Sequence, residues 1–353
     1  MPYNLSQNPY EAATKFITTN ELPISYLDQV ANFITTNTQG ATIGTSQQSS
    51  GPDVWGSENR YRPGDASAQS STLPPAPKLL PQKHYLSILV ARPSAIEKKI
   101  LELNADLINS GSKDVALNPA ETKTLSEIRQ YLEDVAAKKQ AQTVEDGLEL
   151  VIKLATLWPY KYRIPGLDLL RLLVTDADTA RFSYHDNNII DVFIAGATET
   201  DTPADNHVMM AVRGFGNLFD TSDGQKLALA EFDKIYSIVK TSIANSTNRN
   251  LLVATATLFI NYAVLFTSES VADTSFEHII ACLDILTKII GEQRDSEVVY
   301  RALVALGTLL TLDDEVKTAA RDVYSVKGVV EKTAASTVDK RIKELSKEVI
   351  SYL

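Results

Sequence analysis

The sequence predicts an all-α fold, an armadillo-like α-solenoid, and two observations carry this prediction. From about residue 84 onward the chain is patterned almost entirely as helices, with apolar residues at helical spacing. Four similar stretches also recur in its second half: 167–176, 209–219, 255–266 and 299–310. Aligned on one column (Arg171, Arg213, Thr257 and Arg301), they are separated by 42, 44 and 44 residues. Helical repeats of about 40–47 residues are typical of HEAT and armadillo solenoids.

The helices themselves follow from apolar periodicity between polar breakers. We expect them near 93–110, 121–139, 144–156, 163–175, 187–198, 204–218, 223–244, 248–267, 273–291, 295–311, 313–323, 326–334 and 338–352. Asp205, Ser222 and Thr274 each precede an apolar run and are expected to cap a helix. No strand is predicted, and the more polar last helix suits the end of a solenoid.

The first 82 residues differ in composition from the rest of the chain. Residues 1–38 (C-terminal part of a small domain) fit two short amphipathic helices near 9–18 and 24–36, which cannot bury much by themselves. Residues 39–82 are rich in Gly, Ser, Gln, Thr and Pro and predict a flexible linker. Within it, Trp55 and Tyr61 either dock elsewhere or are solvated. The solenoid is expected over 83–353.

Composition and charge exclude several classes of protein. The net charge of −10 argues against a dedicated nucleic-acid or anionic-membrane binder, although a local basic groove is compatible with it. The single cysteine, Cys282, allows no intrachain disulfide, fits a reducing compartment and is expected to be a buried, inert thiol. Without 18 consecutive apolar residues or a visible signal peptide, the chain is expected to be soluble and not secreted.

No catalytic motif is visible in the sequence. The four histidines, His84, His185, His207 and His278, lack metal-ligand spacing. The GFG at 214–216 lacks the third glycine and the preceding strand of a dinucleotide loop. No P-loop and no GxSxG motif occur. We therefore expect neither an enzyme nor a metal or cofactor site.

The repeated column predicts a peptide-binding groove. Residues four apart share a helix face, which pairs Arg213 with Asn217 and Thr257 with Asn261. Asn side chains suit the backbone of an extended peptide, and Arg suits carboxylates. The expected ligand is an extended acidic peptide that ends in a free carboxylate, with the Thr257 repeat contacting backbone through Asn261. The alternative is that these residues only cap, snorkel or pair with local acids such as Asp168.

Aromatic side chains near the column have two interpretations. Trp158, Tyr160 and Tyr162 precede the Arg171 helix, and Tyr262 follows Asn261. They either form a slot for an aromatic side chain of the ligand or fill the space between helices.

Two parts of the chain resemble known domains. The pattern NPYxAAxxFxxxNELPxxYLDQVxxFIxxNT resembles the C-terminal part of a PFU domain. Residues 81–353 look like a PUL domain, with the resemblance carried by LPQKHYLSILVARPSAIEKKILELN, WPYKYRIPGLDLLRLL, VRGFGNLF, NRNLLVATATLFINYAVLF and RALVALGTLL. Together they are similar to the phospholipase A2-activating protein (PLAA) family. Because the propeller and the first half of the PFU domain expected in that family do not precede them, we expect a C-terminal fragment.

The resemblance implies a ubiquitin-pathway adaptor. It implies that the PUL groove binds the acidic C-terminal tail of the AAA ATPase valosin-containing protein, that the PFU part contacts ubiquitin, and that the protein works in cytoplasm and nucleus. Arg171 and Arg301 are the first positions onto which the family's basic groove is carried. The remaining expected groove residues are Arg213, Asn217, Asn261, Tyr262 and Trp158. A scaffold solenoid that uses its convex face or linker is the alternative.

Overall fold

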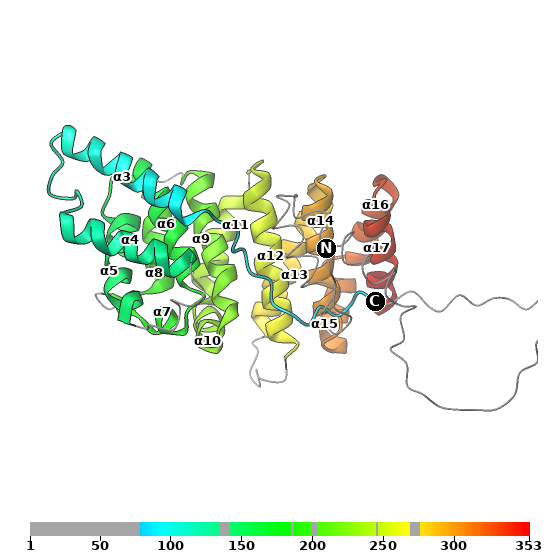
Figure 1. The fold of residues 1–353 in the computed structure, drawn as a ribbon. Helices are drawn as coiled ribbons and strands as arrows, with labels where there is room; N and C mark the ends of the chain where they lie inside the picture. The colour runs from blue at the N-terminus through cyan, green and yellow to red at the C-terminus, as the bar shows by residue number, and fades with distance from the viewer. Residues whose placement is uncertain (1–77, 134–141, 185–186, 200–202, 245, 269–275) are drawn as a thin grey trace, which may run out of the picture. The chain divides into compact units, whose positions relative to one another are not determined.

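The computed structural model describes residues 78–133, 142–184, 187–199, 203–244, 246–268 and 276–353 (Figure 1). The chain divides into two compact units, Met1–Ala76 and Pro77–Leu353, and all described residues lie in the second. The helices expected at 9–18 and 24–36, together with Trp55 and Tyr61, lie outside the described residues.

Helices form nearly all of the second unit, as the sequence predicts. Five of them, here called the inner row, contact one another in sequence order. They are α6 (Ile164–Leu173), α9 (Asp205–Asn217), α12 (Arg249–Phe266), α14 (Ser296–Leu309) and α17 (Lys340–Tyr352). The other α-helices are α3 (Pro93–Asn109), α4 (Pro119–Glu133), α5 (Gln142–Thr156), α7 (Ala177–Arg181), α8 (Ile189–Ala197), α10 (Ser222–Ala230), α11 (Phe232–Ile243), α13 (Phe276–Glu292), α15 (Asp314–Asp322) and α16 (Val326–Ser336). The all-α solenoid fold is confirmed.

The sequence period reappears as hydrogen bonds between neighbouring repeats. The Arg301 side chain donates to the Thr257 hydroxyl, 44 residues earlier, and the Asn261 amide donates to the Gly216 carbonyl, 45 residues earlier. The Asn217 amide donates to the Arg171 carbonyl, 46 residues earlier. Each repeat is therefore joined to the one before it through the aligned column.

Some local predictions are corrected by the structure. The predicted helix 223–244 is two helices, α10 and α11, which are separated by Glu231. Asp205 and Ser222 are first helical residues and not caps, since the N-cap positions belong to Ala204 and Thr221. Residue 274 lies outside the described residues. A two-residue antiparallel pair, β1 (Ser183–Tyr184) with β2 (Asn187–Asn188), was not predicted because it is too short to show strand periodicity.

Helix α12 lies in the core of the second unit. By length and composition it is apolar enough to cross a membrane, yet 83% of its 18-residue window is buried inside the structure. Its Tyr262 ring packs edge-on against Phe219 and Phe232, with centroid distances of 5.1 and 4.9 Å. A helix that is apolar on every face is expected in such a position, between neighbours on all sides.

Residues 79–90, here called the strap, run along the inner row without helix or strand structure, and the chain bends at Pro81 and His84. In Figure 1 the strap crosses in front of α12 and α14 before it reaches α3. Residues 79–82, which the sequence assigns to the flexible linker, are bonded to α14 and α17 through Thr308 and Glu348. Leu80 is buried there, which gives this end of the predicted linker a fixed place.

Candidate functional site: the strap and the cationic row

Two asparagines of the inner row bind the backbone of the strap. The Asn261 Oδ1 accepts from the Leu86 N–H at 2.8 Å, and its Nδ2 donates to the Leu86 carbonyl at 2.9 Å. One repeat earlier, Asn217 makes the same two bonds to Ile88, at 2.6 and 3.1 Å. An asparagine amide has one acceptor and two donor hydrogens, so it can pair with both polar groups of one residue in an extended chain.

The second hydrogen of each Asn Nδ2 is also used. It donates to the preceding inner helix, at Arg171 O for Asn217 (2.7 Å) and at Gly216 O for Asn261 (2.9 Å). Both side chains are fully buried. Because every polar atom is satisfied, the two amides join repeat to repeat and repeat to strap without an uncompensated desolvation cost.

Arg171 holds the end of the strap nearest α3. Its Nη1 donates to the Ile88 carbonyl, its Nη2 donates to the Val90 carbonyl at 3.0 Å, and its Nε binds the Asp168 carboxylate at 2.6 Å. The side chain is only 2% exposed. Asp168 therefore neutralises Arg171 inside the site, while the two terminal nitrogens of Arg171 each donate to a strap carbonyl.

The opposite end of the strap is anchored by α14 and α17. The Glu348 carboxylate accepts from the Leu79 and Leu80 N–H groups at 3.0 and 3.1 Å. The aligned column has Ala305 in α14 where α9 and α12 have asparagine, so no amide is available there. Instead Leu80 packs over Gly307, where a Cβ would lie 2.3 Å from the Leu80 Cδ1. A buried leucine thus replaces the amide contact in this repeat.

The structure corrects three of the expected direct contacts with a partner. Arg171, Asn217 and Asn261 do bind the backbone of an extended segment, but that segment is the chain's own strap. All three side chains are buried beneath it. Sequence reasoning identified the chemistry of these residues and missed their occupant, because the strap was divided between a predicted linker and the start of the solenoid.

Two further expected groove residues belong to the core. The Trp158 indole is 1% exposed and donates from Nε1 to the Val115 carbonyl at 3.0 Å. The Tyr262 ring is also 1% exposed, and its hydroxyl donates to the Ala228 carbonyl at 2.9 Å. Neither side chain can line a groove. Both fill space between helices, which is the second of the two interpretations of the aromatic residues.

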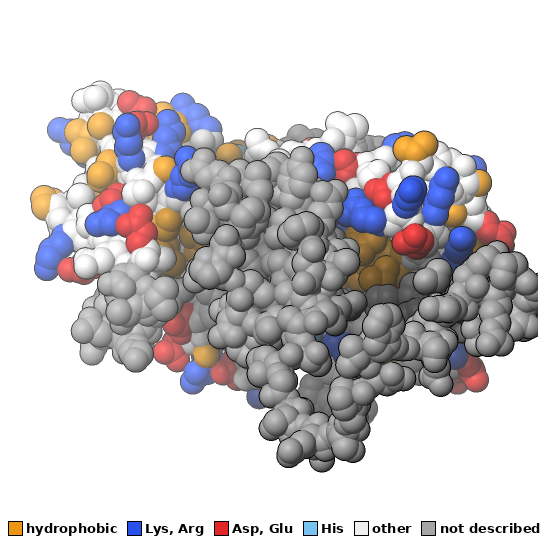
Figure 2. Space-filling view, turned by 45° about the vertical axis from the view of Figure 1, so that its right-hand side comes forward, with side chains coloured by type: hydrophobic (Ala, Val, Ile, Leu, Met, Phe, Trp, Pro, Cys, Tyr) orange, Lys and Arg blue, Asp and Glu red, His pale blue; other side chains and the backbone are white. Residues whose placement is uncertain are grey.

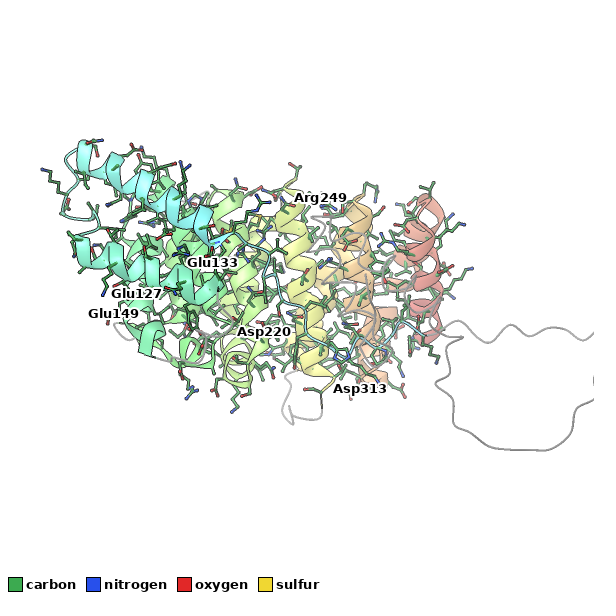
Figure 3. All side chains as sticks on the ribbon, viewed as in Figure 1. Glu127, Glu133, Glu149, Asp220, Arg249 and Asp313 are labelled. Atoms are coloured by element: carbon green, nitrogen blue, oxygen red, sulfur yellow. The ribbon has the colours of Figure 1, made fainter. Side chains whose placement is uncertain are left out.

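Besides Arg171, which lies beneath the strap, four arginines of the inner row lie on the side of the strap nearer the helix N-termini. These four residues, here called the cationic row, are Arg213, Arg249, Arg301 and Arg341. Arg213 lies one turn before Asn217 on the same face of α9. In Figure 3, Arg249 is at one edge of the row of helices, whereas Asp220 and Asp313 are at the opposite edge.

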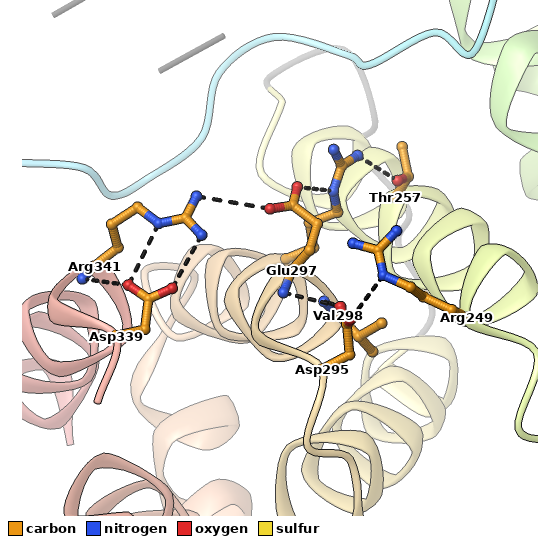
Figure 4. Close-up of polar contacts among 8 residues, drawn as sticks. Arg249, Thr257, Asp295, Glu297, Val298, Asp339 and Arg341 are labelled. Carbon is orange, nitrogen blue, oxygen red and sulfur yellow. Dashed lines mark hydrogen bonds and ion pairs between the residues drawn. The ribbon is translucent and has the colours of Figure 1, made fainter. Parts of the chain in front are cut away.

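Three members of the cationic row have carboxylate partners (Figure 4). Arg301 binds Glu297 at 2.7 Å and Arg341 binds Asp339 at 3.0 Å. Arg249 binds Asp295 at 2.7 Å. Arg301 also donates from Nη1 to the Thr257 hydroxyl at 2.7 Å, so an arginine of the next repeat fills the position where the Thr257 repeat lacks one.

Arg213 is different from the other three. It is half-buried, and within the described part of the chain it has neither a hydrogen bond nor an ion pair. Burial lowers the pKa of the Arg213 guanidinium, the charge of Arg171 lowers it further, and the Asp168 carboxylate acts in the opposite direction. Arginine nevertheless stays protonated at neutral pH. The trio of Arg171, Asp168 and Arg213 thus has a net charge of +1, with Arg213 as its unpaired member.

The described surface that is visible in Figure 2 has charged side chains of both signs. In Figure 2, Lys and Arg side chains are interspersed with Asp and Glu at both ends of the described surface. Exposed pairs of this kind contribute little energy individually and attract no particular ion. Within the cationic row, Arg213 is the one member without a carboxylate partner among the described residues.

A pocket of about 480 Å³ opens beside the strap, between the C-terminal ends of α12 and α14. The strap residues Pro81, Gln82, Lys83 and Tyr85 form one wall. Its other wall is formed by Val264, Thr267, Ser268, Thr311 and Leu312. The mixture of apolar side chains, hydroxyl groups and an exposed lysine suits an amphipathic side chain.

Titratable groups elsewhere serve the fold. Burial raises the pKa of the Cys282 thiol well above its usual value, which confirms the predicted buried, inert cysteine. His207 stacks on Tyr160 with centroids 3.9 Å apart, and its Nε2 donates to the Tyr160 carbonyl at 2.8 Å. Among the described residues, no cluster of His, Cys, Asp and Glu could hold a metal ion.

The fold and the strap-lined inner row define an armadillo-like α-solenoid, and comparison with known proteins gives its family. Residues 80–348 match the PUL domain, and residues 1–42 match the PFU domain, described as PLAA family ubiquitin binding. The chain belongs to the PUL-domain family, and its two domains together place it in the phospholipase A2-activating protein family.

Three curated relatives are each 27% identical to this chain. Ubiquitin homeostasis protein lub1 of Schizosaccharomyces pombe aligns with 99% of the chain and 44% of its own length. Phospholipase A-2-activating protein of Xenopus laevis aligns with 100% and 47%, and Protein DOA1 of Saccharomyces cerevisiae with 92% and 41%. The chain therefore spans less than half the length of each relative.

Solved structures support the fold. A crystal structure of PUL and PFU domains superimposes with a TM-score of 0.54 at 22% identity, covering 99% of this chain and 91% of the other. A crystal structure of PUL gives a TM-score of 0.53 at 20% identity, covering 77% and 99%.

Proposed function

We propose that this chain is part of a ubiquitin-pathway adaptor whose PUL unit binds the acidic C-terminal tail of the AAA ATPase valosin-containing protein. The names of its relatives support the pathway, since one of them is called a ubiquitin homeostasis protein. The PFU match at residues 1–42 supports a contact with ubiquitin. The adaptor would join the ATPase to ubiquitinated substrates.

The observation that carries the proposal is the half-buried, unpaired Arg213 beside the strap. A desolvated guanidinium without a carboxylate is costly unless an anion binds to it. A tail carboxylate would gain charge-assisted hydrogen bonds there, worth roughly 1.5–3 kcal/mol. Since the net charge of the chain is −10, long-range attraction is weak and the local site must supply the affinity for an acidic peptide.

The other site residues have different roles in this proposal. Arg301 lies in the same row and presents a second cation next to Glu297. Arg171 acts indirectly, by holding the strap against which the tail lies. The pocket between Tyr85 and Leu312 accepts an aromatic side chain of the tail, with Lys83 close to its carboxylate.

Calorimetry of the 353-residue chain with a synthetic peptide of the ATPase tail tests the proposal. We expect Arg213→Ala to weaken binding by about 10-fold to 100-fold, the equivalent of one charge-assisted pair. Arg294→Ala is the matched control, because Arg294 is exposed and, among the described residues, bonds to the carbonyls of Gly291 and Gln293 alone. This control removes the same charge from the loop between α13 and α14, where no strap residue is bound, and should leave the affinity unchanged.

Equal affinity of Arg213→Ala and Arg294→Ala for the peptide would show that the cationic row does not bind the tail. If the wild-type chain does not bind the tail peptide at all, the proposal fails. Recovery of partners by an Arg213→Glu variant at wild-type level would favour a scaffold that uses another face.

A further inference from the structure

The backbone of the strap is used on one edge only. The N–H and C=O groups of Leu86 and Ile88 point to Asn261 and Asn217, and the Val90 carbonyl points to Arg171. In an extended chain, the polar groups of successive residues point to opposite edges. The intervening residues therefore direct their backbone groups away from the inner helices.

Those outward groups have no partner within the described residues. Tyr85, Ser87 and Leu89 make no backbone hydrogen bond there. Their side chains do not hide this edge, because the Ser87 hydroxyl is turned to Asp220 and the Tyr85 ring packs on Phe219, with centroids 5.6 Å apart. Ser87 and Leu89 are exposed. The strap thus presents an open strand edge over at least five residues.

From this pattern we propose that the outer edge of the strap is a β-augmentation site for an extended acidic peptide. The peptide adds as a strand, exchanging backbone hydrogen bonds with Tyr85, Ser87 and Leu89. An added strand lies about 4.8 Å from its neighbour and presents every second side chain to the same flank. The two asparagines hold the strap in the extended register that such pairing needs.

Charge decides which class of peptide fits this edge. Arg213 lies one turn along α9, about 5.4 Å, from Asn217, which binds Ile88, so Arg213 is next to the strap on the face of α9 that the strap crosses. An acidic residue on the matching flank of the added strand meets an unpaired cation. The identity of the peptide rests on the proposed function. The inference adds that the peptide is bound by backbone hydrogen bonds to the strap as well as by side-chain contacts.

Proline substitution tests the edge directly. Ser87→Pro removes an N–H that has no partner among the described residues and places a ring on the open edge, whereas Ser87→Ala removes only the hydroxyl and its bond to Asp220. We expect Ser87→Pro to bind the ATPase tail peptide about tenfold or more weakly than Ser87→Ala, at equal helical circular dichroism. Leu89→Pro against Leu89→Ala is a second matched pair on the same edge.

A backbone scan of the peptide tests the same inference with the wild-type chain, so it does not depend on how the variants fold. N-methylation at successive peptide positions should weaken binding at every second residue, because only alternate amides face the strap. Absence of this alternation, or equal affinity of the proline and alanine variants, overturns the inference and leaves tail binding intact. No binding by the wild-type chain overturns the proposed function and this inference with it.

Discussion

Two arginines one repeat apart, Arg171 and Arg213, occupy equivalent positions in the sequence and opposite states in the structure. Arg171 is 2% exposed, and each of its three guanidinium nitrogens donates a hydrogen bond, one to Asp168 and two to the strap. Arg213 is half-buried and has no partner within the part of the chain that the structure describes. The chain satisfies one guanidinium with its own carbonyl groups and leaves the next one available.

The contrast teaches how a repeat architecture can separate stability from binding. Neighbouring helices contribute the same column, but the strap passes over only part of each helix. Beneath the strap, polar side chains bind its backbone and stabilise the fold. One helical turn away from the strap, an arginine is available to bind an anion. Substitutions on the two sides of this boundary should therefore change different measured quantities.

The largest expected effect is at Asn261, on the strap side of the boundary. Asn261→Ala removes three hydrogen bonds and leaves the Leu86 N–H and the Leu86 and Gly216 carbonyls without partners. We expect a loss of about 2–4 kcal/mol in the free energy of unfolding, since unsatisfied groups cost more than the bonds contribute. Urea denaturation measures it. Asn250→Ala, an exposed position on the same helix, is the control and should stay within about 0.5 kcal/mol.

The second prediction compares Arg171→Ala with Arg213→Ala in one unfolding experiment. Arg171→Ala should lower the free energy of unfolding by about 1.5–3 kcal/mol, because strap carbonyls lose a charged donor and Asp168 loses its partner. Arg213→Ala should leave it unchanged or raise it by up to about 1 kcal/mol, because a partly desolvated charge is removed and no bond to another described residue is lost. A similar loss for both variants would abolish the distinction between a structural and an available arginine.

A smaller effect is expected at Gly307, where the strap has a leucine contact in place of an amide. Gly307→Ala brings a Cβ to 2.3 Å from the Leu80 Cδ1 and 3.0 Å from the Val349 Cγ2. Gly328→Ala, at an exposed position of α16 with nothing within 4 Å, should gain about 0.5–1 kcal/mol in helix propensity. We expect Gly307→Ala to be about 1–2 kcal/mol less stable than that control.

Hydrogen exchange locates the Gly307 effect along the strap. The Leu79 and Leu80 amides, which donate to Glu348, should exchange faster in Gly307→Ala, whereas the Leu86 and Ile88 amides keep their asparagine partners and their protection. Loss of protection along the whole strap would mean that its two ends are not independent.

The fold was predictable from the sequence because its signals are local and periodic. Helical spacing gave the elements, and the aligned column gave the repeat that appears as hydrogen bonds 44–46 residues apart. The chemistry of Asn217 and Asn261 was also predictable, since an amide in a buried groove suits a peptide backbone. Confirmed features are therefore those that residue type and spacing decide.

The occupant of the asparagines was not predictable in the same way. Leu86 lies 175 residues from Asn261, and no periodicity links an extended segment to a distant helix. Pro-rich composition also favoured a flexible linker up to residue 82, whereas the burial of Leu80 depends on the space left by Gly307. Long-range pairing of this kind is decided by tertiary packing, which sequence patterns do not contain.

The smallest expected effect is at His207, which lies in helix α9 together with Arg213. These two basic side chains differ in whether they can lose their charge when they are buried. Burial lowers the pKa of His207, with a further contribution from the Arg163 charge, and its Nδ1 has no partner among the described residues. His207 can stay neutral, whereas Arg213 cannot lose its proton. Because the folded-state pKa of His207 is lowered, its contribution to stability is complete above about pH 6.5 and is lost as the pH falls below it.

Thermal unfolding at pH 7.5 and 5.5 of the wild type and of His207→Gln measures this contribution as a difference, which removes the titration of the carboxylates common to both. The wild type should lose more stability on acidification than the variant, by at most about 1.4 kcal/mol per pH unit. Tail-peptide affinity should not follow the same curve, because the charge of Arg213 is constant over this range. If affinity and stability fall together below pH 6.5, the binding site depends on the protonation state of the helix core, and the boundary between the two sides of the inner row would not hold on α9.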